Sequence, residues 1–300
     1  MVGRIVEVAS DGVHLSAQRG FLKISLKQKP VGQVVFDQIE ALVVHGHGIT
    51  LSTHLIARLS EAGIPLITCG RNHAPISITW PIEGHHAQGF RMEAQAAASQ
   101  PLKKRLWRDL VKAKINNQVL ILNYFDLPTA RLHRLAKAVR SGDETNCEAQ
   151  AAQYYWRLLM GDKFRRDRQS SGINQLLNYG YMILRAATAR SIVASGLHPS
   201  LSLHHQSRGS SLRLADDLME PFRPFVDYLV RQCMEQDELE LNKDVKAKLA
   251  ALPKLDLKRE DCVSPLQICL DQAANSLAQV FEKECDGLEL PIDLHLTAAE

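Results

Sequence analysis

Two hydrophobic patterns follow one another along this chain, and the change between them falls near residue 85. Before that point, short runs rich in Val, Ile and Leu alternate with turn residues, which is typical of strands. The runs that predict strands are RIVEVAS, FLKISLK, VVFDQIEALVVHG and GIPLITCG, and APISITWP closes the region. Between two of them, THLIARLSEAG predicts a short helix that ends at Gly63. We therefore expect a small β-rich domain over residues 1–83.

From about residue 91 onward the apolar period is helical. Leu102, Leu106 and Leu110 recur every four residues, and INQLLNYGYMILRAATARSIVASGL predicts one long helix. The segment GHHAQGF, residues 84–90, carries two glycines and no apolar period, which predicts a hinge. The expected fold class is α+β, with the N-terminal β-rich domain followed by a larger all-α helical domain over residues 91–300.

Composition narrows the class of protein without deciding it. The chain has 300 residues, of which 45% are hydrophobic, so one large domain or two can each bury a core. The net charge of +3 does not indicate a nucleic-acid-binding protein, and any DNA-binding site must come from a local cluster of basic residues. The six cysteines form no CxxC pair and are expected to be reduced thiols. Without an apolar leader or a run long enough to span a bilayer, we expect no membrane partner and a cytoplasmic location.

Three residues that lie far apart in sequence, Glu148, His205 and Glu220, are the candidate site residues. Two carboxylates and an imidazole that converge on one point would bind Mg²⁺ or Mn²⁺ and leave positions open for phosphate oxygens. A cation held in this way supports phosphodiester transfer. Asp216 and Asp217 precede Glu220, and three acids this close repel one another unless a cation relieves them.

Each of these residues also has an ordinary explanation. Glu148 heads an apolar helical stripe, but the helix dipole favours a glutamate in any first turn. His204 and His205 are adjacent in a loop and would point to opposite sides if extended, so at most one reaches a metal. Glu220 could belong to an acidic helix start that Asp216 or Asp217 caps.

Basic residues gather in three segments, KKRLWRDLVKAK, RLHRLAKAVR and KFRRDR. Solvated helix faces commonly have this composition. The third segment differs because it follows the predicted Glu148 helix directly, where it could hold a DNA backbone near the metal. Arginine suits this role, since its planar fork matches phosphate oxygens. The candidate DNA-binding residues are Lys163, Arg165, Arg166 and Arg168.

The Glu148 segment, INQLLNYGY, the HH pair and DLMEPFRP together resemble the CRISPR-associated integrase of spacer acquisition, most closely its type II branch. The resemblance runs from GRIVEV to about residue 235, and the residues beyond it predict simply more helix. It implies an N-terminal β-domain through which a homodimer forms, and a larger helical domain. It also implies that Glu148, His205 and Glu220 are catalytic metal ligands. It favours His205 over His204 because His205 has the family's separation from Glu220.

The activity that the resemblance implies is metal-dependent insertion of short DNA fragments into a CRISPR array, by attack of a 3′-hydroxyl on a phosphodiester. The implied partners are DNA, as spacer precursor and array, and a small ferredoxin-like CRISPR adaptation subunit, with the type II effector nuclease as a further candidate. Two alternatives stay open. One is a stand-alone metal-dependent DNA nuclease with water as nucleophile. The other is a non-catalytic helical DNA-binding protein, which would leave Glu148 far from His205.

Overall fold

The computed structural model describes residues 4–70, 75–79, 81–82, 84–167, 169–206, 211–258 and 263–292. Arg168 and Cys262, which the sequence singled out, lie outside these ranges. The chain divides into two compact units, Met1–His86 and Ala87–Glu300. The hinge predicted over residues 84–90 spans this division. Its last three residues were predicted wrongly, because helix α2 begins at Gln88 and residues 88–90 are helical.

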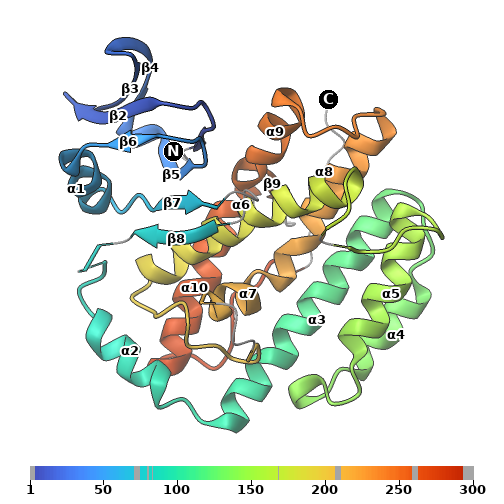
Figure 1. Cartoon of the computed structure of the whole chain (residues 1–300). Helices are drawn as coiled ribbons and strands as arrows, with labels where there is room; N and C mark the ends of the chain where they lie inside the picture. The colour runs from blue at the N-terminus through green and yellow to red at the C-terminus, as the bar shows by residue number, and fades with distance from the viewer. Residues whose placement is uncertain are drawn as a thin grey trace. The chain divides into compact units, whose positions relative to one another are not determined.

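Unit 1 consists of two four-stranded sheets and helix α1 (Figure 1). One sheet has the order β1-β5-β7-β8, in which the first three strands are parallel and β8 runs antiparallel to β7. The other has the order β4-β3-β2-β6, an antiparallel meander to which β6 adds in parallel with β2. The bounds are β1 Arg4–Val8, β2 Val13–Gln18, β3 Phe21–Leu26, β4 Lys29–Val35, β5 Ile39–Val44, β6 Thr50–Leu51, α1 Thr53–Glu61, β7 Leu66–Cys69 and β8 Pro75–Thr79.

Alternating side chains of both sheets meet in one core in unit 1. Leu15 of β2, Leu22 of β3 and Leu42 of β5 are fully buried there, and α1 adds Leu55 and Leu59 from one helical face. The helix predicted before Gly63 is therefore confirmed. The run VVFDQIEALVVHG is not one strand, because a 3-10 turn at Phe36–Gln38 separates β4 from β5. The sequence also did not single out β2.

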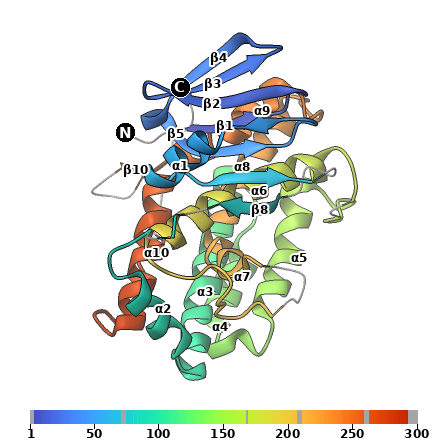
Figure 2. The same cartoon turned by 60° about the vertical axis from the view of Figure 1, so that its left-hand side comes forward.

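Unit 2 is mostly helical, as Figure 2 shows from a second side. The long helix predicted from INQLLNYGY onward is confirmed as α6. The predicted fold class, a β-rich domain followed by a larger helical one, is confirmed, except that β9 and β10 form a short antiparallel pair in the domain expected to be all-α. The bounds are α2 Gln88–Ala96, α3 Gln100–Tyr124, α4 Ala130–Ala138, α5 Cys147–Met160, α6 Ile173–Ala194, α7 Arg213–Leu218, α8 Arg223–Glu235, α9 Lys243–Ala250, β9 Asp256–Lys258, β10 Val263–Pro265 and α10 Leu266–Glu282.

Helix α3 is the central element of unit 2, where it contacts α4, α5, α8 and the 3-10 turn Glu220–Phe222. The helix begins where the Ser99 side chain accepts a hydrogen bond from Leu102 N–H. The leucine stripe that predicted the helix faces the core, since Leu106 and Leu110 are fully buried. This buried helix can therefore present side chains to four other elements at once.

Two further observations limit what the chain is. Among the described helices, none has the length and apolar character that a membrane span requires. The five cysteines within the described residues are free thiols.

Candidate active site

Glu148 lies in the first turn of α5, as the sequence predicted, but it does not cap the helix. The Asp143 carboxylate accepts hydrogen bonds from Cys147 N–H at 2.9 Å and from Glu148 N–H at 3.0 Å. Asn146, at the helix start, has left-handed backbone geometry and makes no side-chain cap. Because Asp143 satisfies these helix-terminal donors, the Glu148 carboxylate is free to turn toward α3.

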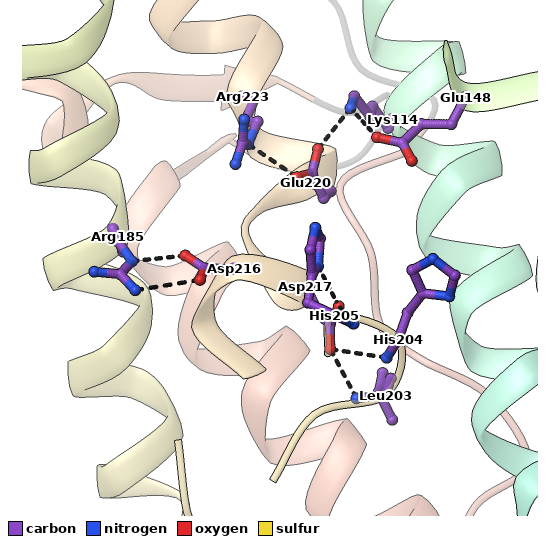
Figure 3. Close-up of polar contacts among 10 residues, drawn as sticks. All are labelled: Lys114, Glu148, Arg185, Leu203, His204, His205, Asp216, Asp217, Glu220 and Arg223. Carbon is purple, nitrogen blue, oxygen red and sulfur yellow. Dashed lines mark hydrogen bonds and ion pairs between the residues drawn. The ribbon is translucent and has the colours of Figure 1, made fainter. Parts of the chain in front are cut away.

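Glu220 occupies the 3-10 turn Glu220–Phe222, between α7 and α8. Helix α3 holds this turn, since Asn117 Nδ2 donates to Pro221 O at 2.8 Å. The Glu220 residue is only 3% exposed, so its charge needs partners. Its Oε2 accepts from Lys114 Nζ at 2.6 Å, and its Oε1 forms an ion pair with Arg223 Nε at 3.1 Å. Figure 3 shows these contacts.

Lys114 joins the two glutamates. Its Nζ also donates to Glu148 Oε1 at 2.6 Å, so one buried ammonium lies between carboxylates that are 72 residues apart in sequence (Figure 3). Burial works to lower the pKa of Lys114, but the negative charges of Glu220 and Glu148 outweigh it and raise the pKa. Burial likewise opposes ionisation of Glu220, but Arg223 and Lys114 hold its pKa below the usual value. Lys114 and Glu220 are therefore held in their charged forms.

Asp217 organises the loop that carries the two histidines. The Asp217 residue is fully buried, and its carboxylate accepts from the backbone N–H groups of Leu203, His204 and His205 at 2.7–3.1 Å. The same carboxylate bonds His205 Nδ1 at 2.6 Å. A carboxylate accepts, so the proton of the neutral imidazole sits on Nδ1 and the lone pair on Nε2. This is the arrangement by which carboxylates orient metal-binding histidines.

The two histidines have different environments. The ring of His204 stacks on Trp107 of α3, with centroids 4.3 Å apart and planes 2° apart. The hydrogen bond that His205 donates to Asp217 raises the pKa of His205, against the effect of burial, and the negative charge of Glu220 adds to the rise. Figure 3 shows the His205 ring pointing toward Glu220 and the His204 ring toward α3. The geometry therefore favours His205 as the imidazole of the site.

The three acids near Glu220 were expected to repel one another unless a cation relieves them, and in the structure each acid has its own partner. Asp216 binds Arg185 of α6 through both oxygens, at 2.6 and 3.2 Å, and Asp217 binds the histidine loop. Neither of them caps a helix, since both lie in the second half of α7. The carboxylates of Asp216 and Asp217 are thus bound to Arg185 and to the histidine loop, and Glu220 is the acid that faces α3.

The donor set fits a divalent cation in part. Glu148 and Glu220 already converge on one buried positive charge, and His205 offers Nε2 beside Glu220. Two carboxylates and an imidazole suit Mg²⁺ or Mn²⁺. Among the described residues, however, no group of three or more His, Cys, Asp or Glu side chains is arranged to hold a metal. The Lys114 ammonium occupies the position between the carboxylates.

The basic segment after α5 divides by environment. Lys163 and Arg165 are exposed, and the Arg165 guanidinium donates to the backbone carbonyls of Asp162 and Phe164 in its own loop. Arg166 is half-buried and donates to Asn174 at 3.0 Å and to Asn178 at 2.6 Å, both on α6. Of the candidates that the structure describes, Lys163 and Arg165 are therefore available to a ligand, while Arg166 ties its loop to α6.

Sequence reasoning missed Lys114, Asp217 and Trp107 as site residues. Lys114 stood in a segment interpreted as a solvated basic face. The informative signal was its spacing, because it lies four residues after Leu110 and continues the buried leucine stripe. Asp217 and Trp107 gave no comparable signal, since their roles depend on a loop that folds back from elsewhere in the chain.

The sequence profile described as CRISPR associated protein Cas1 matches residues 6–254. A relative named CRISPR-associated endonuclease Cas1, from Neisseria meningitidis serogroup C (strain 8013), is 35% identical over 286 residues, which cover 94% of this chain and 93% of that protein. CRISPR-associated endonuclease Cas1 1 from Francisella tularensis subsp. novicida (strain U112) is 27% identical, over 80% of this chain and 82% of that protein.

Solved structures show the same fold. A casposase bound to integration product superposes with a TM-score of 0.78 at 19% identity, covering 95% of this chain and 92% of the other. A Cas1 protein from Thermotoga maritima also gives 0.78, at 18% identity, over 93% and 97% of the two chains. A chain of a Cas6-RT-Cas1–Cas2 complex gives 0.73 at 17% identity, over 98% of this chain and 36% of that one.

Proposed function

Because this chain belongs to the Cas1 family of CRISPR-associated proteins, we propose that it is a metal-dependent DNA integrase, which inserts short DNA fragments into a CRISPR array. The observation that carries this proposal is the meeting of Glu148 and Glu220 on one buried cation, Lys114 Nζ, at 2.6 Å from each. Burying two carboxylates close together is costly unless a cation between them offsets their negative charges. The relative from Neisseria meningitidis, which is named an endonuclease, supports the same reaction class.

In this proposal, Glu148, Glu220 and Nε2 of His205 hold one Mg²⁺ or Mn²⁺. When bound, the cation lowers the pKa of the attacking 3′-hydroxyl and offsets negative charge on the phosphate. Asp217 keeps the proton of His205 on Nδ1 and so directs Nε2 to the site. One P–O bond forms while another breaks, so the reaction consumes no nucleotide cofactor.

The expected partners follow from the same proposal. The casposase structure contains an integration product, and other neighbours are complexes that include Cas2, so DNA and a small CRISPR adaptation subunit are the expected partners here. A homodimer joined through unit 1 would place two sites at the two ends of one fragment, and a cytoplasmic location would give access to the array. Light scattering at micromolar concentration tests the dimer, since a monomer would contradict it.

The DNA path proposed for the basic segment can be tested by a matched pair of variants. Arg165→Gln removes an exposed arginine and should weaken DNA binding, with a fall of about one unit in the slope of log affinity against log salt. Arg166→Gln instead breaks the contacts with Asn174 and Asn178 and should lower the melting temperature. Equal DNA affinity of Arg165→Gln and wild type would remove this segment from the proposed path.

Strand joining is the experiment that tests the proposed function. Purified protein is incubated with its small partner, a short duplex and a supercoiled plasmid that carries the array, with Mg²⁺ or Mn²⁺. The proposal expects covalent attachment of the duplex to the plasmid. Plasmid cleavage without attachment would favour the stand-alone nuclease, in which water is the nucleophile.

A further inference from the structure

Lys114 places a permanent cation between the two carboxylates of the candidate site. Its Nζ lies 2.6 Å from Glu148 Oε1 and 2.6 Å from Glu220 Oε2, and its side chain is only 10% exposed. Arg223 pairs with the other oxygen of Glu220. Two carboxylates thus face two cations, and this four-residue cluster is formally neutral without any metal.

We propose that Lys114 is a built-in counter-ion, which holds Glu148 and Glu220 together in the metal-free protein and makes tight binding of a divalent cation depend on DNA phosphate. This inference rests on the proposed function. A divalent cation that enters between the carboxylates meets the ammonium charge at close range, where burial limits screening by salt. A phosphodiester group brings the negative charge that offsets this repulsion. Metal and DNA phosphate therefore each strengthen the binding of the other.

A purely structural lysine would behave differently. Its removal would destabilise the protein, because Glu148 and Glu220 would lose a shared partner and repel each other. It would not, however, increase affinity for a metal in the absence of DNA. The counter-ion role requires an increase in metal affinity, because removing the ammonium leaves the negative charges of Glu148 and Glu220 without the cation between them.

The matched control lies on the same helix. Lys112 is half-buried, two residues before Lys114, and within the described part of the chain it makes no hydrogen bond or ion pair that resembles those of Lys114. Lys112→Met therefore makes the same change of side chain and charge on α3 but leaves the carboxylate pair intact.

The experiment measures Mn²⁺ binding to the full-length protein by calorimetry and by the electron spin resonance signal of free Mn²⁺. Without DNA, Lys114→Met should bind Mn²⁺ at least about tenfold more tightly than wild type, and Lys112→Met should equal wild type. Metal-free Lys114→Met should melt at a lower temperature than wild type, and Mn²⁺ should raise the melting temperature of this variant more than that of wild type.

The second arm adds a short DNA duplex whose strands end in 3′-deoxynucleotides, so that no joining occurs. Wild-type affinity for Mn²⁺ should rise about tenfold with this duplex, and the rise should be smaller in Lys114→Met. If Lys114→Met does not fold, the comparison passes to Lys114→Gln, which should bind Mn²⁺ more tightly than wild type, and Lys114→Arg, which keeps the charge and should not.

Equal Mn²⁺ affinity of wild type and the uncharged variants, with and without DNA, would overturn the counter-ion role but leave the proposed function in place. Absence of Mn²⁺ binding in every variant, even with DNA, would overturn the metal site itself and this inference with it.

Discussion

The ring of His205 bonds Asp217 through Nδ1 at 2.6 Å, although the two residues come from a loop and from a helix 12 positions later. The same carboxylate holds three successive backbone N–H groups of that loop. Asp217 therefore sets both the shape of the loop and the direction of the imidazole. A loop histidine, which sequence alone would leave mobile, becomes a fixed group.

Replacing Asp217 with asparagine should lower the pKa of His205 toward its ordinary value of 6.5, because the hydrogen bond that His205 donates to the Asp217 carboxylate is the largest cause of the rise. The stabilisation from this pair is present below the unfolded pKa and is lost as the pH rises through the raised folded pKa. The variant should therefore lose stability mainly at acidic to neutral pH. NMR titration of the His205 ring protons measures the shift.

Asp216→Asn is the matched control, since Asp216 pairs with Arg185 and contributes less to the pKa of His205. An unchanged pKa of His205 in Asp217→Asn would contradict the role given to Asp217.

Asp227 predicts a second pH dependence. This carboxyl is 2% exposed and accepts a hydrogen bond from Tyr181 at 2.5 Å, and burial raises its pKa to about 7. The folded state thus binds the proton more tightly than the unfolded chain, so wild-type stability falls as the pH rises from about 4 to about 7. The asparagine would not titrate, so the stability of Asp227→Asn should rise by roughly 2–4 kcal/mol relative to that of wild type between pH 4 and pH 8.

Urea unfolding across this pH range measures the effect, with Asp256→Asn on the exposed face of β9 as a control that should follow wild type. A difference between Asp227→Asn and wild type that does not change with pH would show that Asp227 keeps an ordinary pKa.

Gly180 allows α6 and α8 to approach closely. A Cβ at this position would lie 2.5 Å from Val226 Cγ1, so Gly180→Ala should destabilise the protein by about 1–3 kcal/mol. A Cβ at Gly89 in α2 meets nothing within 4 Å, and Gly89→Ala should be neutral or stabilising by up to about 1 kcal/mol. Thermal unfolding compares Gly180→Ala with Gly89→Ala. Adding Val226→Ala to Gly180→Ala should restore part of the lost stability, because it removes the side chain that the new Cβ meets. Similar melting temperatures for the two alanine variants would contradict this packing.

The elements that sequence predicted best are those with a long, uninterrupted period. The leucine stripe of α3 and the run that forms α6 each span many turns, so local pattern and burial agree. The segment from β4 to β5 was predicted as one strand because Phe36, which is apolar and buried, continues the hydrophobic run of β4 into the 3-10 turn Phe36–Gln38. The β9–β10 pair is only three residues long in each strand, too short for a period.

The site was predicted through its acids and imidazole, but not through the groups that position them. Glu148, His205 and Glu220 were found because short motifs surround them. Lys114 lies on α3, 34 residues before Glu148 and 106 before Glu220, and it contacts both glutamates only after α3, α5 and the Glu220 turn pack together. No single segment of the sequence reveals such a tertiary contact. The one local signal is a charged residue at a position where the pattern expects an apolar one.

The catalytic assignment is best tested at Glu148 rather than at Glu220. Glu220 is buried against Lys114 and Arg223, so Glu220→Ala would leave one uncompensated positive charge in the buried cluster, at a cost of about 3–5 kcal/mol. A loss of folding could then be mistaken for a loss of catalysis. The Glu148 side chain is 27% exposed and therefore tolerates change better. Glu144 is its control, since it precedes the same helix, is 73% exposed and pairs with Lys104 at 3.6 Å.

The most direct measurement is the rate of strand joining by Glu148→Gln, beside Glu144→Gln and wild type, with melting temperature and DNA affinity recorded for all three. We predict that Glu148→Gln remains folded, binds DNA as wild type does and loses strand joining by about a hundredfold or more. Glu144→Gln should join strands at the wild-type rate. Joining at the wild-type rate by folded Glu148→Gln would contradict the metal-dependent site.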